Sequence, residues 1–124
     1  MYHNWYAIWM KTPILDVYFY KTEHGNEPVR QWLQSLATMD KKRIGEDIKT
    51  VQFGWPLGMP LVKHIGGNLW EVRIQLNKRI ARVLFALDMN SMVLIHGFIK
   101  KQQKILKADL DLAKDRVKQL QGRL

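Results

Sequence analysis

Four segments of the chain carry the apolar pattern of β-strands. They are residues 14–20 (ILDVYFY), 69–76 (LWEVRIQL), 79–87 (RIARVLFAL) and 92–99 (MVLIHGFI). Residues 69–76 alternate, with aromatic and aliphatic side chains on one face and Leu69, Glu71 and Arg73 on the other. The last three segments follow one another with short polar connections, and therefore predict an antiparallel three-strand meander.

Three other segments have helical spacing. Pro28 suits the first position of a short helix whose apolar stripe is Val29, Trp32, Leu33 and Leu36. Asp40 is the predicted N-cap of a second helix with the stripe Ile44, Ile48, Val51 and Trp55. A C-terminal helix is predicted from the spacing of Leu106, Leu110, Ala113, Val117 and Leu120. Residues 54–60 (GWPLGMP) are too rich in glycine and proline for regular structure.

The order strand, two helices, three strands, helix predicts an α+β fold. We expect a small antiparallel sheet, made of the N-terminal strand and the meander, packed against the helical hairpin. The helices are expected to cover one face of this sheet and to leave the other partly open for a site. With 124 residues, the chain is predicted to be a single domain over 1–124.

Charge separates the C-terminal half from the rest. The net charge is +9; residues 63–82 hold +4 of it and residues 96–124 hold +5, while the remaining residues balance. Such localisation favours a polyanionic ligand or an acidic partner, with a solvated basic surface as the alternative. The chain contains no cysteine, which excludes disulfide and thiolate chemistry and fits a reducing cytoplasm.

The first residues, MYHNWYAIWM, resemble neither a signal peptide nor a membrane span, and no membrane association is expected. Met10 is a plausible start of translation, in which case residues 1–9 are an upstream extension. An additional strand, or a patch that docks on a partner, is an equally good interpretation.

Two arginines are the strongest candidates for chemistry. If Asn77 and Lys78 form a two-residue hairpin loop, Arg73 lies directly opposite Arg82. Because facing arginines repel, we expect either an anion or the nearby Glu71 between them. Glu71 is then a structural counter-ion.

Histidine and lysine side chains follow the arginines. His96 and Lys100 belong to the next strand, Lys101 comes directly after it, and the predicted loop before the hairpin adds Lys63 and His64. This set suits RNA cleavage without a metal, which needs a base for the 2′-hydroxyl, cations for the phosphorane and an acid for the leaving 5′-oxygen. Arginine provides the fork that matches phosphate, whereas lysine transfers protons only where its neutral form is favoured.

We therefore assign catalysis to Arg73, Arg82, His96 and Lys100, and RNA binding to Lys63, His64, Arg79, Lys101 and Lys104. No metal-ligand set and no cofactor are expected. Each residue also has an ordinary interpretation, as a packed histidine, a lysine at a strand end or a surface cation.

The order of several short segments resembles the phage-derived HigB-like branch of the RelE/ParE toxin superfamily. These segments are FYKTEHGNEPVRQWLQSL, LWEVRI, RIARVLF, VLIHGFIKK and the helix with Ala113 and Arg116. The resemblance extends from residue 14 to about residue 120, although no single segment is specific. A proline that often opens the final helix of this branch is replaced here by QKILKAD.

This resemblance implies a RelE-like fold and a cytoplasmic toxin of a type II toxin–antitoxin system. It also implies a HigA-like helix-turn-helix antitoxin as partner, and cleavage of mRNA in the ribosome during translation. Two alternatives stay open: a ParE-like inhibitor of DNA gyrase on the same fold, and a non-catalytic RNA-binding module in which Trp70 and Phe98 contact bases.

Overall fold

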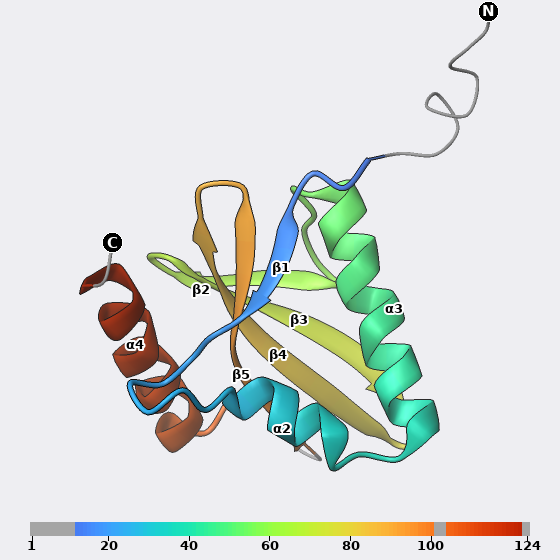
Figure 1. The fold of residues 1–124 in the computed structure, drawn as a ribbon. Helices are drawn as coiled ribbons and strands as arrows, with labels where there is room; N and C mark the ends of the chain where they lie inside the picture. The colour runs from blue at the N-terminus through green and yellow to red at the C-terminus, as the bar shows by residue number, and fades with distance from the viewer. Residues whose placement is uncertain (1–11, 101–103, 123–124) are drawn as a thin grey trace, which may run out of the picture.

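A computed structural model describes residues 12–100 and 104–122 of the chain (Figure 1). The elements are β1 (Asp16–Phe19), α2 (Pro28–Gln34), α3 (Thr38–Gly54), β2 (Val62–Gly66), β3 (Leu69–Leu76), β4 (Arg79–Asp88), β5 (Ser91–Lys100) and α4 (Lys107–Gly122). The α+β class is confirmed, and the architecture is consistent with a RelE-like fold. None of the helices within the described residues is long and apolar enough to span a membrane.

The sheet has five strands in the order β1-β5-β4-β3-β2. Strands β3, β4 and β5 form the predicted antiparallel meander, but β1 lies parallel to β5, so the sheet is mixed. The expectation of a purely antiparallel sheet was therefore wrong. The chain passes through α2, α3, β2, β3 and β4 between β1 and β5, so nothing in the local sequence around β1 fixes its direction.

Strand β2 was missed by the sequence analysis, which placed Lys63 and His64 in a loop. This segment pairs with β3 from Val62 opposite Val72 to Gly66 opposite Leu69, with an irregularity between His64 and Gly66. It is short and lies close to Pro60 and Gly67, which is why the local pattern indicates a loop.

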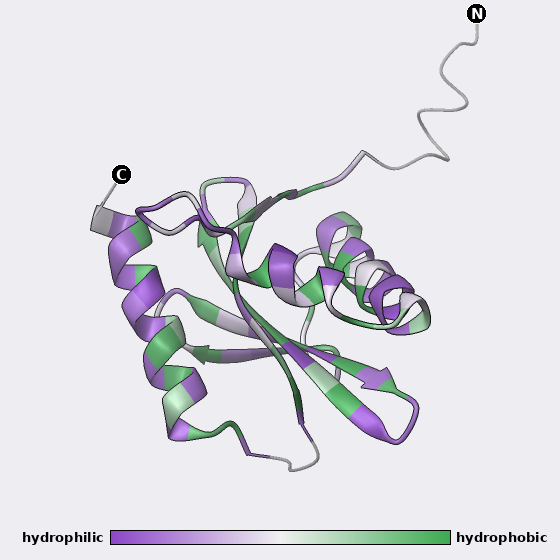
Figure 2. Ribbon diagram, turned by 60° about the horizontal axis from the view of Figure 1, so that its bottom comes forward, coloured by the Kyte–Doolittle hydropathy of each residue, from purple (hydrophilic) through white to green (hydrophobic). Residues whose placement is uncertain are grey.

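The helices lie on both faces of the sheet, not on one as predicted (Figure 2). The predicted stripe of α3 is buried against the first face, where Ile44, Ile48 and Val51 join Val72, Ile74 and other strand residues. On the opposite face, Ala113 and Val117 of α4 pack on a second cluster that includes Leu84 and Ile95. The second face also carries charged residues, and two of them, Glu71 and Arg82, are buried.

Two helix starts differ from the prediction. Helix α3 begins at Thr38 with Ala37 as N-cap, so Asp40 lies inside the first turn. Helix α4 begins at Lys107, and Leu106 is 56% exposed before it. Asp40 is held by an arginine of the sheet instead of capping the helix, as described below, whereas Leu110, Ala113, Val117 and Leu120 of the predicted stripe do pack on the sheet.

Candidate functional site

Arg73 and Arg82 face each other on β3 and β4, as the two-residue hairpin loop predicts. Glu71 lies between them: its Oε2 is 2.9 Å from Nη1 of Arg82, and its Oε1 is 3.2 Å from Nε of Arg73. Of the two arrangements that the sequence left open, the structure contains the one in which Glu71 is the shared counter-ion. The three residues form what we call the ion triad.

The two arginines of the triad are not equivalent. The side chain of Arg82 is 1% exposed and that of Glu71 is fully buried, whereas the side chain of Arg73 is 27% exposed. A buried guanidinium needs its carboxylate to offset the loss of hydration. Arg82 therefore acts through Glu71 and Arg73, and Arg73 is the arginine that solvent and an incoming phosphate can reach.

His96 is brought to the same face by a β-bulge. Leu84 pairs with His96 but the next residue, Phe85, pairs with Leu94, so Ile95 is an extra residue in β5. A bulge of this kind changes the side to which the following side chains point. Without it, His96 would alternate onto the same face as Leu94, against α2 and α3.

The imidazole of His96 is held by a carboxylate from α4. Its Nε2 lies 2.8 Å from Oδ1 of Asp109, in the first turn of that helix, and its ring lies 5.2 Å from the ring of Phe98. An ionised carboxylate only accepts hydrogen bonds, so Nε2 carries a proton in this contact, and in the neutral form of the imidazole Nδ1 holds the free lone pair. This is the orientation of a histidine prepared for general acid–base work.

Arg116 anchors α4 to the bulge. Its Nη1 donates to the carbonyl oxygen of Ile95 at 2.9 Å, and its guanidinium lies 5.6 Å from the ring of Tyr20. Burial lowers the pKa of Arg116, although arginine stays cationic at any physiological pH. The bulge therefore has its extra carbonyl satisfied by the helix that also supplies Asp109.

Lysines surround the buried part of the ion triad. A cavity of about 290 Å³ is lined by Lys63, Ile65, Glu71, Arg82, Lys104, Ile105 and Leu110. Lys63 pairs directly with Glu71 in the register of β2 and β3. Lys63 and Lys104 thus add positive charge beside Glu71 and Arg82.

The ammonium group of Lys100 already has partners within the protein. Its side chain is buried, its ammonium donates to the backbone carbonyl of Lys104, and Nζ lies 5.4 Å from the ring centroid of Phe98. In this arrangement Lys100 fixes the connection from β5 to α4, which leads to Asp109. Lys101 lies outside the described residues.

Two of the predicted RNA-binding residues lie elsewhere. His64 is stacked on Trp70 at 4.7 Å and bonds through Nε2 to the carbonyl oxygen of Gly67, on the face opposite to Lys63. Arg79 makes two hydrogen bonds to Asp40, of 3.1 and 2.9 Å, and so ties β4 to α3. The structure does not bring either residue to the ion triad.

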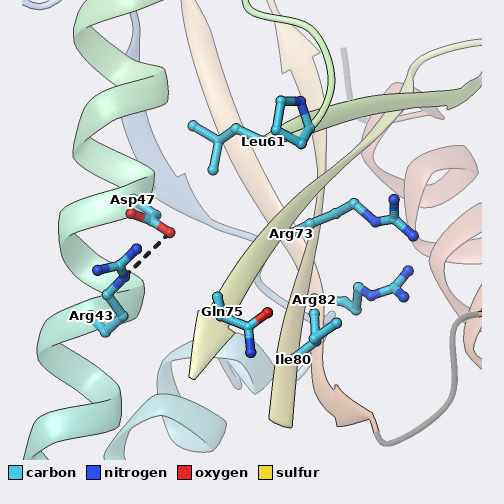
Figure 3. A pocket seen from close by; sticks show the side chains of 8 residues that line it. Arg43, Asp47, Leu61, Arg73, Gln75, Ile80 and Arg82 are labelled. Atoms are coloured by element: carbon cyan, nitrogen blue, oxygen red, sulfur yellow. Dashed lines mark ion pairs between the residues drawn. The ribbon is translucent and has the colours of Figure 1, made fainter. Parts of the chain in front are cut away.

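The sequence analysis missed Asp109 and Arg43. Asp109 had a usable signal, since it is an acidic residue in the predicted first turn of the last helix, but nothing local points it at His96. Arg43 belongs to α3, yet it lines a second cavity together with Arg73 (Figure 3). Within residues 12–100 and 104–122, no group of three histidine, aspartate or glutamate residues could hold a metal ion.

One face of the sheet carries three chemical elements: a partly exposed arginine with a buried partner, a histidine bonded to a carboxylate, and flanking lysines. Cations placed in advance stabilise the negative charge that develops on phosphate. The cations of this face can bind a phosphodiester, and its histidine can transfer a proton.

Comparison with protein families shows which family the chain resembles. The model described as Phage derived protein Gp49-like (DUF891) matches residues 31–118, from α2 almost to the end of α4. This range includes the ion triad, His96 and Asp109. No curated protein matches the chain.

Proposed function

Since the chain belongs to the family of phage-derived Gp49-like proteins, we propose that it is the toxin of a type II toxin–antitoxin pair. In this proposal it is an endoribonuclease that cleaves mRNA on the ribosome during translation and so arrests growth. The observation that carries the proposal is the partly exposed Arg73 on the same sheet face as the Asp109-bound His96. The resemblance to HigB-like toxins supports the ribosome as the place of action, and with it the cytoplasm.

In the proposed reaction, the 2′-hydroxyl of the substrate attacks the neighbouring phosphorus and the 5′-oxygen of the next nucleotide leaves. His96 Nδ1 takes the 2′-hydroxyl proton, and Asp109 stabilises the imidazolium that forms. The leaving 5′-oxygen takes a proton from water, the imidazolium returns its proton to solvent, and the products carry a 2′,3′-cyclic phosphate and a 5′-hydroxyl. Arg73 contacts the phosphoryl oxygens, while Lys63 and Lys104 attract the RNA strand.

The partner in this proposal is a HigA-like helix-turn-helix antitoxin. An acidic segment of the antitoxin would neutralise the basic face, because a toxin with +9 net charge attracts such a segment. Co-expression with the neighbouring gene is expected to restore growth and to yield a stable complex.

The decisive experiment adds purified protein to a translating extract and maps the 5′ ends of the mRNA. We expect new ends with the wild type, a loss of about 10²–10⁴-fold in rate for His96→Gln and a large loss for Arg73→Ala. His24→Gln and Arg30→Ala are matched controls, since both residues are exposed and distant from the triad. Intact mRNA with the wild-type protein would contradict the proposal, and DNA damage with intact mRNA would point to gyrase inhibition instead.

A further inference from the structure

A second cavity lies at the free edge of β3, next to the ion triad. Its volume is about 460 Å³, and it is lined by Arg43, Asp47, Pro60, Leu61, Arg73, Gln75, Ile80 and Arg82. Among the described strands, β2 pairs with β3 only as far as Val72, so the edge of β3 beyond that residue has no strand beside it. Helix α3 forms one side of this opening, which we call the edge notch (Figure 3).

The edge notch combines an apolar wall with charged and polar side chains. The apolar lining comes from Pro60, Leu61 and Ile80, and the other five lining residues are charged or polar. A lining of this kind suits a ligand that carries both a ring and phosphate groups. A planar base can contact these apolar side chains, because such contacts do not depend on which base is present.

Arg43 gives the notch a cation that can change partner. Its Nε is 3.6 Å from Oδ2 of Asp47 one helical turn along, and its side chain is 52% exposed. Although Asp47 is only 16% exposed, the guanidinium of Arg43 reaches solvent, so it can contact a phosphate while Asp47 stays beside it. Arg73 lines the same cavity, which places the two arginines on either side of the notch.

Gln75 has a fixed amide. Its Nε2 donates to the carbonyl oxygens of Leu76 at 3.0 Å and of Arg79 at 3.3 Å. Only the NH₂ end of an amide can face two carbonyl oxygens, so the opposite orientation is excluded by repulsion. The Oε1 atom is therefore turned away from the hairpin backbone, toward the side on which Arg82 lies (Figure 3).

We propose that the edge notch binds one nucleotide of single-stranded RNA, next to the phosphate held by Arg73. Gln75 Oε1 accepts a hydrogen bond from an exocyclic amine of the base, and Arg43 binds the phosphate on the far side of that nucleotide. Gln75 is thus a specificity-determining residue and Arg43 a phosphate-binding residue. The inference rests on the proposed function, since it names a substrate contact of the same site.

The binding test uses the full chain and two trinucleotides, adenylate and purine-riboside phosphate, which differ only in the exocyclic amine. By isothermal titration at low salt, we expect the wild type to bind the adenylate trimer about threefold to tenfold more tightly, as one hydrogen bond allows. Gln75→Leu should remove this difference. Arg43→Ala should weaken both trimers about equally, by roughly fivefold, because a phosphate contact carries no base information.

Matched controls lie on α2. Gln34→Leu changes an exposed glutamine, and Arg30→Ala removes an arginine that is 57% exposed and paired with Glu27 within its helix, as Arg43 is with Asp47. Equal binding of both trimers by the wild type would overturn the inference. It would also be overturned if the controls showed the same losses as the notch variants.

The mapped mRNA ends separate this inference from the proposed function. If the wild type binds the trimers selectively but leaves mRNA intact, the nuclease proposal fails and the nucleotide site stands. If mRNA is cut, but Gln75→Leu leaves both the cleavage positions and the trimer affinities unchanged, the site fails and the nuclease proposal stands.

Discussion

Successive side chains of the central strands point to opposite faces of the sheet, and the two faces bury different kinds of side chain. Toward α2 and α3, the buried residues are aliphatic and aromatic, among them Val72, Ile74, Val83 and Phe85. Toward α4, the same strands bury Glu71 and Arg82 beside the apolar residues. The first face stabilises the fold by removing apolar surface from water. On the second face, the desolvation of buried charges offsets part of the stabilisation from apolar burial.

The covering helices explain this difference. Helices α2 and α3 leave no gap above Gly97, where an added Cβ would lie 2.3 Å from the ring of Trp32. Helix α4 packs on the apolar residues of its face, and the charged residues beside them border two cavities. A close-packed face and a partly open charged face on one sheet separate the folding core from the candidate site.

The largest expected effect is on the charged face, where removal of one buried ion leaves the other unpaired. Glu71→Ala should lower the free energy of unfolding by about 3–5 kcal/mol, as measured by urea denaturation. Arg73→Ala, which removes a half-exposed partner, should lower it by about 1 kcal/mol or less.

The double variant Glu71→Met/Arg82→Met separates the effect of the buried charges on stability from their effect on cleavage. Apolar side chains of similar volume often replace a buried ion pair without loss of stability, so we expect near wild-type stability without mRNA cleavage. If the double variant is as unstable as Glu71→Ala, the buried ion pair itself stabilises the fold, contrary to this expectation.

On the apolar face, the tightest contact is between Gly97 and Trp32. Gly97→Ala should lower the free energy of unfolding by about 1–3 kcal/mol, because the added methyl group displaces a packed ring. In a Trp32→Leu background the same change should have a smaller effect, and a double-mutant cycle of thermal unfolding measures the difference. Additive effects would mean that the ring moves away freely.

Substitution of Arg116 shows whether the anchoring of α4 affects stability alone or also mRNA cleavage. Arg116→Met keeps the aliphatic stem but removes the donor to the carbonyl oxygen of Ile95, at an expected loss of about 1–2 kcal/mol. Because this bond holds the bulge that carries His96, we also expect slower mRNA cleavage in the folded variant. Unchanged cleavage would show that the bulge keeps its shape without Arg116.

The smallest effect is expected at the margin of the apolar face. Arg79→Ala breaks the pair with Asp40, both side chains of which solvent partly reaches, and should change the free energy of unfolding by about 1 kcal/mol or less. Since Arg79 lies away from the triad, cleavage should be retained. A large loss of cleavage at unchanged stability would indicate that Arg79 binds RNA, as the sequence predicts.

Local pattern was sufficient for much of the fold. The alternation over residues 69–76 and 79–87, with a two-residue loop between them, determined the strand pairing and placed Arg73 opposite Arg82. The stripe Ile44, Ile48 and Val51 determined which face of α3 is buried. These features depend on residues a few positions apart, so backbone periodicity and turn geometry are enough to predict them.

Tertiary structure decided the features that join distant residues. Three are central here: the direction of β1, the packing of α4 on the second face, and the bulge at Ile95 that moves His96 beside Asp109. The sequence left open whether an anion or Glu71 separates the two arginines, and only packing determined that Glu71 and Arg82 are buried while Arg73 reaches solvent. Burial depends on which element covers a residue, and that element is here far along the chain, beyond the reach of local periodicity.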